Sequence, residues 1–194
     1  MSRSDSGLAS APGRDPAADA AGPALERIVL VGFMGAGKST VGTELARLLD
    51  WSFVDMDRWI EEQAGLTIAH IFEQRGEAAF RDLERRLAED LAGRRRCVVA
   101  AGGGAFAGTR TRRALRSGAL TVWLQCDFET ALGRLPADGS RPLAANHERM
   151  AALFAQREAS YRLADWAVDA SAASPQEVAH QIWETVMGRG TLSR

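Results

Sequence analysis

The chain has 194 residues, of which 46% are hydrophobic and 25% are charged, and its formal net charge is −1. This composition is that of a globular domain with its own hydrophobic core. The near-zero charge excludes a general attraction to nucleic acid or to an anionic membrane, and no apolar run approaches the roughly 20 residues of a membrane-spanning helix, so we expect neither kind of partner.

Residues 1–24 are rich in Ala, Pro, Gly, Ser and Asp, and they contain almost no large apolar side chains. Such a segment cannot bury enough surface to offset its ordering entropy, so we predict a disordered tail, followed by one domain at 25–188 and a short tail at 189–194. Because the first tail has neither a signal sequence nor the acid-poor composition of a transit peptide, we expect a cytoplasmic protein. Cys97 and Cys126 lie in separate apolar runs without CxxC spacing, which is typical of buried thiols in a reducing compartment.

The first strong motif lies after an apolar run at Arg27–Val31, which predicts a strand. Residues 32–39 read GFMGAGKS, which matches every fixed position of a phosphate-binding P-loop. Glycines let backbone N–H groups point at phosphate oxygens, and the helix that begins near Lys38 adds its positive end. Lys38 can reach the β- and γ-phosphates and Ser39 can bind Mg²⁺. The motif therefore predicts a nucleoside triphosphate with Mg²⁺, against the alternative of a glycine-rich turn with an exposed lysine.

Beyond the P-loop, short apolar runs alternate with amphipathic stretches. Further strands are predicted at Ser52–Val54, Cys97–Ala101, Leu120–Leu124 and Trp166–Asp169. Helices are predicted at Lys38–Leu49, Asp57–Gln63, Thr67–Glu73, Glu77–Leu91, Thr109–Arg116, Phe128–Leu135, His147–Arg162 and Pro175–Met187. The strands are apolar at nearly every residue, as expected for strands covered on both faces. The order predicts an α/β fold with a five-stranded parallel sheet between helices, in which ligands bind at the carboxyl ends of the strands.

Two aspartates, Asp55 and Asp57, follow the second predicted strand. Alternate residues of an extended segment point to the same side, so one carboxylate can hold hydrated Mg²⁺ while the other binds or deprotonates a hydroxyl acceptor. The structural alternative is that Asp57 caps the following helix. With a P-loop in the same chain, we favour the functional interpretation.

Three consecutive glycines, Gly102, Gly103 and Gly104, follow the third predicted strand. Ordering three glycines costs much conformational entropy on folding, which makes sense where a substrate must approach backbone N–H groups closely. The alternative is a flexible strand-to-helix turn. Arg81 and Arg157 lie on predicted helices, and the planar guanidinium group suits bidentate binding of a carboxylate. Taken singly, either arginine fits a solvated or salt-bridged helix position better.

A polar, turn-rich segment at about 136–146 carries Arg141. In phosphoryl transfer, an arginine brought over the γ-phosphate stabilises the spread negative charge, and a mobile loop also excludes water. We therefore predict a lid in this segment, against the alternative of a plain surface connection.

The set of motifs resembles the shikimate kinase family, small relatives of the nucleoside monophosphate kinases. The resemblance rests on GFMGAGKST at 32–40, Asp55-Met56-Asp57, FRDLE at 80–84, Gly102–Ala105, Arg141-Pro142-Leu143, and Arg157 with Tyr161. It runs from about Arg27 to Met187. The P-loop alone is shared by many families, whereas its combination with the triple glycine and both arginines is specific. Residues 136–140 match no family-specific pattern.

The resemblance implies a three-layer α/β/α kinase that phosphorylates the 3-hydroxyl of shikimate from Mg-ATP, giving shikimate 3-phosphate and ADP on the route to chorismate and aromatic amino acids. One Mg²⁺ ion would be organised by Ser39 and Asp55. Asp57 would be the candidate base, and Lys38 and Arg141 would stabilise the transferring phosphoryl group. The implied ATP contacts are Gly35, Ala36, Gly37, Lys38, Ser39, Thr40, Arg134 and Arg141. The implied shikimate contacts, around a subregion at about 57–85, are Asp57, Arg81, Gly102, Gly103, Gly104 and Arg157.

We expect ATP and shikimate as the partners of a monomeric enzyme. Two alternatives stay open at this point. One is a kinase of the same fold that acts on gluconate or a nucleoside monophosphate, against which the triple glycine and the two arginines argue. The other is a nucleotide-binding module without catalysis, against which Lys38, Asp57 and Arg141 argue.

Overall fold

The computed structural model describes residues 25–135 and 147–188, so both predicted tails and the predicted lid with Arg141 lie outside the described residues. The strands are β1 (Arg27–Val31), β2 (Ser52–Asp55), β3 (Cys97–Ala100), β4 (Leu120–Gln125) and β5 (Trp166–Asp169). The helices are α1 (Lys38–Leu49), α2 (Met56–Ala64), α3 (Ile68–Ala92), α4 (Thr109–Arg116), α5 (Phe128–Gly133), α6 (His147–Tyr161) and α7 (Pro175–Gly188).

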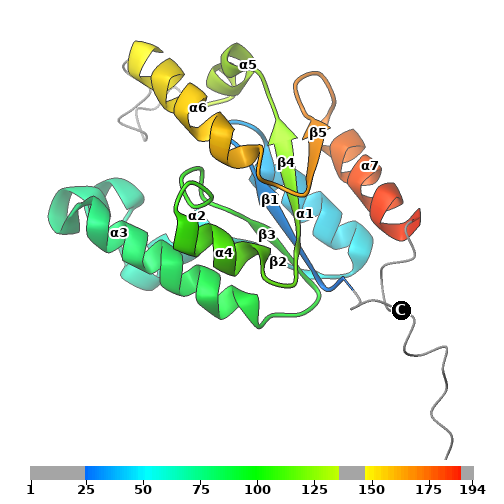
Figure 1. Cartoon of the computed structure of the whole chain (residues 1–194), viewed down its shortest axis with the longest axis horizontal. Coiled ribbons are helices and arrows are strands. Elements are labelled where there is room, and N and C mark those ends of the chain that lie inside the picture. The colour runs from blue at the N-terminus through cyan, green and yellow to red at the C-terminus, as the bar shows by residue number, and fades with distance from the viewer. Residues whose placement is uncertain (1–24, 136–146, 189–194) are drawn as a thin grey trace, which may run out of the picture.

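The strands form one five-stranded sheet in the order β2-β3-β1-β4-β5, and every neighbouring pair is parallel. Helices α1 and α7 lie together on one face, and α3 and α4 lie together on the other (Figure 1). The predicted α/β/α arrangement is therefore confirmed. The carboxyl ends of all the strands lie at the same end of the sheet, and α5 lies beyond that end (Figure 1).

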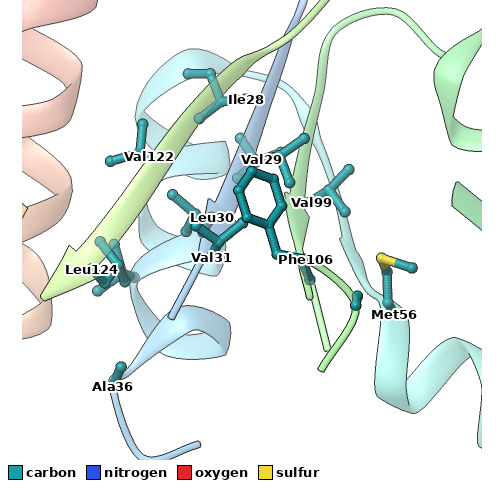
Figure 2. Close-up of a cluster of buried hydrophobic side chains, with 14 of the residues drawn as sticks. Ile28, Val29, Leu30, Val31, Ala36, Met56, Val99, Phe106, Val122 and Leu124 are labelled. Carbon is teal, nitrogen blue, oxygen red and sulfur yellow. The ribbon is translucent and has the colours of Figure 1, made fainter. Parts of the chain in front are cut away.

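Burial separates the central strands from the edge strands. Every residue of β1 and β3 is buried, whereas β2 and β5 each bury a single residue, Val54 and Val168. The expectation of strands covered on both faces is thus wrong for the two edges, which have a neighbouring strand on one side only. Figure 2 shows the central cluster, in which Phe106 lies among side chains of β1, β3 and β4. This packing anchors the turn that follows the triple glycine.

One local detail departs from the sequence prediction, and a second concerns the alternative that Asp57 caps the following helix. The helices predicted on either side of residue 76 form one element, α3, interrupted at Gly76, whose φ of 78° and ψ of 167° are not helical. Glycine adopts this positive φ without the steric cost of a Cβ. Helix α2 is capped by Asp55 rather than by Asp57, because the Asp55 carboxylate accepts hydrogen bonds from the N–H groups of Asp57 and Arg58.

A buried arginine ties together the end of the sheet opposite the carboxyl ends of the strands. Arg27 begins β1 and is 2% exposed. Its guanidinium group donates to the carbonyl of Leu91, at the end of α3, and to that of Ser117, directly after α4. The positive charge thus meets the negative ends of two helix dipoles. Burial lowers the pKa of Arg27, so this cation stabilises the fold only through well-placed carbonyl acceptors.

We expect Arg27→Met to lower the free energy of unfolding by about 3 kcal/mol, because two hydrogen bonds from a charged donor are lost. Urea denaturation followed by circular dichroism measures this change. The matched control is Arg95→Met, which breaks an ion pair with Glu26 in which the Arg95 side chain is 76% exposed. Such pairs contribute about 0–1 kcal/mol, so equal losses in the two variants would contradict the assignment.

Candidate active site

The P-loop joins β1 to α1 and depends on glycine at its turns. Gly32, Gly35 and Gly37 have φ of 149°, 79° and 90°, a region that residues with a side chain rarely adopt. At Gly35 an added Cβ would lie 2.0 Å from the carbonyl oxygen of Ala131. Lys38, the first residue of α1, donates from Nζ to the carbonyls of Gly32 and of the next residue at 2.9 Å each. The loop therefore holds its lysine over the turn at the positive end of a helix.

Ser39 and Asp55 form the candidate magnesium site. The Ser39 hydroxyl, on the first turn of α1, donates a hydrogen bond to Oδ2 of Asp55 at the end of β2. A hydroxyl and a carboxylate oxygen side by side are ligands that Mg²⁺ prefers. Within the described residues, no group of three or more His, Cys, Asp or Glu side chains could hold a metal ion by itself. The pair therefore fits an ion that also takes phosphate oxygens and water as ligands.

A cavity of about 410 Å³ opens at the carboxyl ends of the strands. Its lining includes the P-loop with the start of α1, both aspartates, one glycine of the triplet and residues on the β5 side: Gly35–Val41, Asp55, Asp57, Gly103, Arg134 and Pro175. The predicted nucleotide contacts in the described part of the chain thus lie around one space. Asp57 and Gly103 form its boundary with the remaining predicted site residues.

Arg134, directly after α5, reaches across to the chain beyond β5. Its guanidinium group donates to the carbonyls of Ala170 at 3.0 Å and Ser171 at 2.8 Å. These bonds hold the Arg134 plane beside the loop that leads to Pro175, and both residues line the cavity. A flat cation and a proline ring that line the same cavity could hold an adenine base between them. The geometry is compatible with adenine packing on Arg134, which stays a prediction.

The glycine triplet is packed against charged side chains. An added Cβ on Gly102 would lie 2.5 Å from Oδ1 of Asp57 and 2.9 Å from Oε1 of Glu84. An added Cβ on Gly104 would lie 2.6 Å from Nη1 of Arg81. All three distances are below 3.0 Å, which real Cβ atoms essentially never show, so a side chain at either position would push these groups away. Glycine is required here for the close approach of charged groups, which the alternative of a flexible turn does not explain.

Glu84, the last residue of the FRDLE motif at 80–84, lies among the predicted site residues although no role was predicted for it. It is 1% exposed, and its Oε2 accepts a hydrogen bond from Nη1 of Arg81 at 2.7 Å. In the described part of the chain, its Oε1 has no hydrogen-bond partner. Burial raises the pKa of Glu84, and the neighbouring Arg81 opposes that rise. The sequence does contain a signal for this pair. Glu84 follows Arg81 by three residues, and residues i and i+3 share one face of a helix.

Arg157 approaches the triplet from α6. Its Nη1 would lie 3.2 Å from a Cβ on Gly103, and its guanidinium carbon lies 5.9 Å from the ring centre of Phe33 in the P-loop. Burial lowers the pKa of Arg157, and the charge of Arg81 lowers it further. Two guanidinium groups are therefore held close enough to repel each other, with the buried Glu84 carboxyl as their shared counter-charge. Planar guanidinium groups of this kind can bind a carboxylate through two parallel hydrogen bonds, so the predicted role of Arg81 and Arg157 stays a prediction.

Comparison with known proteins supports the same assignment. The family model described as shikimate kinase matches residues 34–187. A shikimate kinase of Moorella thermoacetica is 44% identical over 161 residues, which cover 82% of this chain and 93% of that protein. One from Sulfurihydrogenibium is 40% identical, over 85% of this chain and 100% of the relative. The chain belongs to the shikimate kinase family. The predicted family is thereby confirmed.

Solved structures extend the likeness to the fold. Shikimate kinase from Acinetobacter baumannii, in complex with shikimate, superposes with a TM-score of 0.81 at 35% identity, covering 85% of this chain and 94% of that chain. The enzyme from Aquifex aeolicus gives a TM-score of 0.76 at 36% identity, with coverage of 84% and 98%. A gluconokinase from Sinorhizobium meliloti, at 18% identity and a TM-score of 0.53, shares the fold alone.

We expect Gly104→Ala to raise the KM for shikimate by about tenfold or more, because the new methyl group displaces the Arg81 guanidinium, and misplacement of a binding group by about 1 Å is costly. Steady-state kinetics measures this effect. The control is Gly93→Ala, where the nearest atom to an added Cβ is the Asp90 carbonyl oxygen at 4.0 Å. An unchanged KM in the folded Gly104→Ala variant would contradict the close-approach interpretation.

Tyr161 allows a test of burial by pH, because it is the chain's only tyrosine. Burial raises its pKa to about 12, whereas an unfolded tyrosine ionises near pH 10. The folded state therefore retains this proton between about pH 10 and 12, and stability falls as the pH rises through that window. Near-ultraviolet absorbance measures tyrosinate directly. Tyrosinate formation near pH 10 in protein that circular dichroism shows to be folded would contradict the burial.

Proposed function

We propose that the described site carries out the reaction of the shikimate kinase family, transfer of the γ-phosphoryl group of ATP to the 3-hydroxyl of shikimate. Membership of the family confirms the predicted reaction class. The observation that carries the residue-level proposal is that Asp57, Arg81 and Arg157 meet at the glycine triplet directly beside the P-loop. A phosphate donor site and a carboxylate-binding acceptor site thus share one wall.

On the donor side, the P-loop N–H groups and the start of α1 would bind the phosphates of ATP. Lys38 would contact the β- and γ-phosphates from its place over the loop. Ser39 and Asp55 would hold Mg²⁺, which when bound neutralises charge on the phosphates. Arg134 would pack on adenine. Arg141, outside the described residues, is proposed to stabilise the γ-phosphoryl group.

On the acceptor side, Arg81 and Arg157 would bind the shikimate carboxylate as two charge-assisted contacts. That carboxylate would relieve the repulsion between the two guanidinium groups. Asp57, at the boundary between the triplet and the nucleotide cavity, would bind the reacting hydroxyl and accept its proton. The amide groups of the triplet, Gly102, Gly103 and Gly104, would contact the ligand at close range.

The rate would come mainly from positioning and electrostatics, because the transition state of phosphoryl transfer is loose and needs little covalent chemistry from the protein. None of the described helices combines the length and the apolar composition that crossing a bilayer requires. We propose that the chain acts as a monomer in the cytoplasm. Its division into tails, a kinase domain, a shikimate-binding subregion and a lid stays a prediction.

A coupled ADP-release assay on the purified full chain tests the function. We expect release that needs both shikimate and Mg-ATP, with none above background for gluconate or a nucleoside monophosphate. Lys38→Ala is the matched control against a contaminating kinase, and it should lower turnover by about a thousandfold, because a preorganised charge partner of the transition state is lost. Phosphorylation of gluconate or a nucleotide with shikimate untouched would contradict the proposal, and tight ATP binding without turnover would favour a nucleotide-binding module.

A further inference from the structure

Tyr161, the last residue of α6, joins the two parts of the acceptor site. Its hydroxyl donates a hydrogen bond of 2.5 Å to the carbonyl of Gly103, the middle glycine of the triplet. Arg157 lies one helical turn earlier on α6, and its charge acts on the same hydroxyl and opposes the rise of the Tyr161 pKa. The hydroxyl is thus bound to the backbone of the triplet and lies near the cation that faces the acceptor site.

The hydrogen bond constrains more than the carbonyl that accepts it. A trans peptide is planar, so the Gly103 carbonyl and the Gly104 N–H point in opposite directions from one rigid unit. With the carbonyl held towards Tyr161, the Gly104 N–H faces away from that side chain. Within residues 25–135 and 147–188, no carbonyl or side chain accepts a hydrogen bond from that N–H, so it remains a donor for a ligand. Glycine has no side chain to hold this peptide in place, so an outside contact must set its orientation.

The ring of Tyr161 is fixed independently of its hydroxyl. The residue is 2% exposed, and its ring centre lies 6.2 Å from that of Trp123 on β4. Removing the oxygen alone therefore leaves the packing of the ring in place. This separates a role in orienting the site from a role in filling the core.

We propose that Tyr161 is a positioning residue for shikimate, which holds the Gly103–Gly104 peptide and the Arg157 guanidinium in their binding orientation. The inference rests on the proposed function, because it assigns a residue to the acceptor half of that site. Tyr161 acts through the peptide and the guanidinium group and does not itself contact the reacting atoms. Its effect belongs to binding of the acceptor rather than to the nucleotide.

The test compares Tyr161→Phe with Thr121→Val in steady-state kinetics and urea denaturation. We expect Tyr161→Phe to raise the KM for shikimate about tenfold, because a buried hydrogen bond is lost and its acceptor is left unpaired. The KM for ATP and kcat should change less than about threefold. Thr121→Val removes another fully buried hydroxyl, which donates to Oδ2 of Asp165 at 2.6 Å at the start of β4, away from the site. It should lower stability at least as much and leave the KM for shikimate unchanged.

Several results would overturn the inference. These are an unchanged KM for shikimate in Tyr161→Phe, an equal rise in the KM for ATP, or an equal rise in the Thr121→Val control. If the unmodified chain shows no shikimate-dependent ADP release, the proposed function is wrong, and the inference falls with it. The unmodified chain therefore tests the function, and the variants test the role of Tyr161.

A measurement on the unmodified chain covers the case in which Tyr161→Phe does not fold. Carbon-13 at Cζ of tyrosine gives one resonance, because the chain has a single tyrosine. We expect saturating shikimate to shift this resonance, since the Gly103–Gly104 peptide and Arg157 beside the hydroxyl would take up the ligand. We expect ATP alone to leave the resonance in place. A resonance that shikimate does not move would contradict the positioning role.

Discussion

The acceptor half of the site depends on one steric constraint, the absence of side chains at the end of β3. At Gly102 and Gly104, a Cβ would lie within 3 Å of a carboxylate or a guanidinium group. Because these positions are bare, Asp57, Glu84 and Arg81 can all reach the backbone of the triplet. Asp57 belongs to α2, which follows β2, and Glu84 and Arg81 belong to α3, whereas the P-loop follows β1 on the other side of β3 from β2. The glycines therefore let separate elements share one small volume beside the phosphate site.

Charge balance follows from this crowding. Arg81 and Arg157 lower the cost of burying Glu84, yet burial still raises the pKa of that carboxyl. Asp57 and Glu84 both lie at Gly102, and Glu77 also pairs with Arg81, so the two guanidinium groups already have carboxylates of this chain nearby. Charges in such surroundings are screened less than in water. Binding of an added carboxylate would therefore depend on where the two guanidinium groups are held, and not on an excess of positive charge in the cluster.

Local patterns predicted much of this molecule, and distant contacts limited the rest. The bounds of β1, α1, α4 and β5 agree with the apolar runs and turn residues of the sequence, because each is an element whose ends carry local signals. The P-loop placed the nucleotide cavity in the same way. By contrast, the hydrogen bond between Tyr161 and Gly103 joins residues 58 positions apart, and no spacing rule predicts it. The cap at Asp55 was not predicted, because the only alternative considered for a cap was the nearby Asp57, which is of the same residue type.

The donor and acceptor halves are also joined by direct packing. Phe33, a P-loop residue that is 2% exposed, packs edge-on against Phe154 of α6 with ring centres 5.1 Å apart, and its ring also faces Arg157. One aromatic side chain of the P-loop therefore packs against α6, the helix that carries Arg157. Close-packed interiors resist small displacements. Buried aromatic packing therefore holds the P-loop and α6 in a fixed relation, across the boundary between the cavity and the glycine triplet.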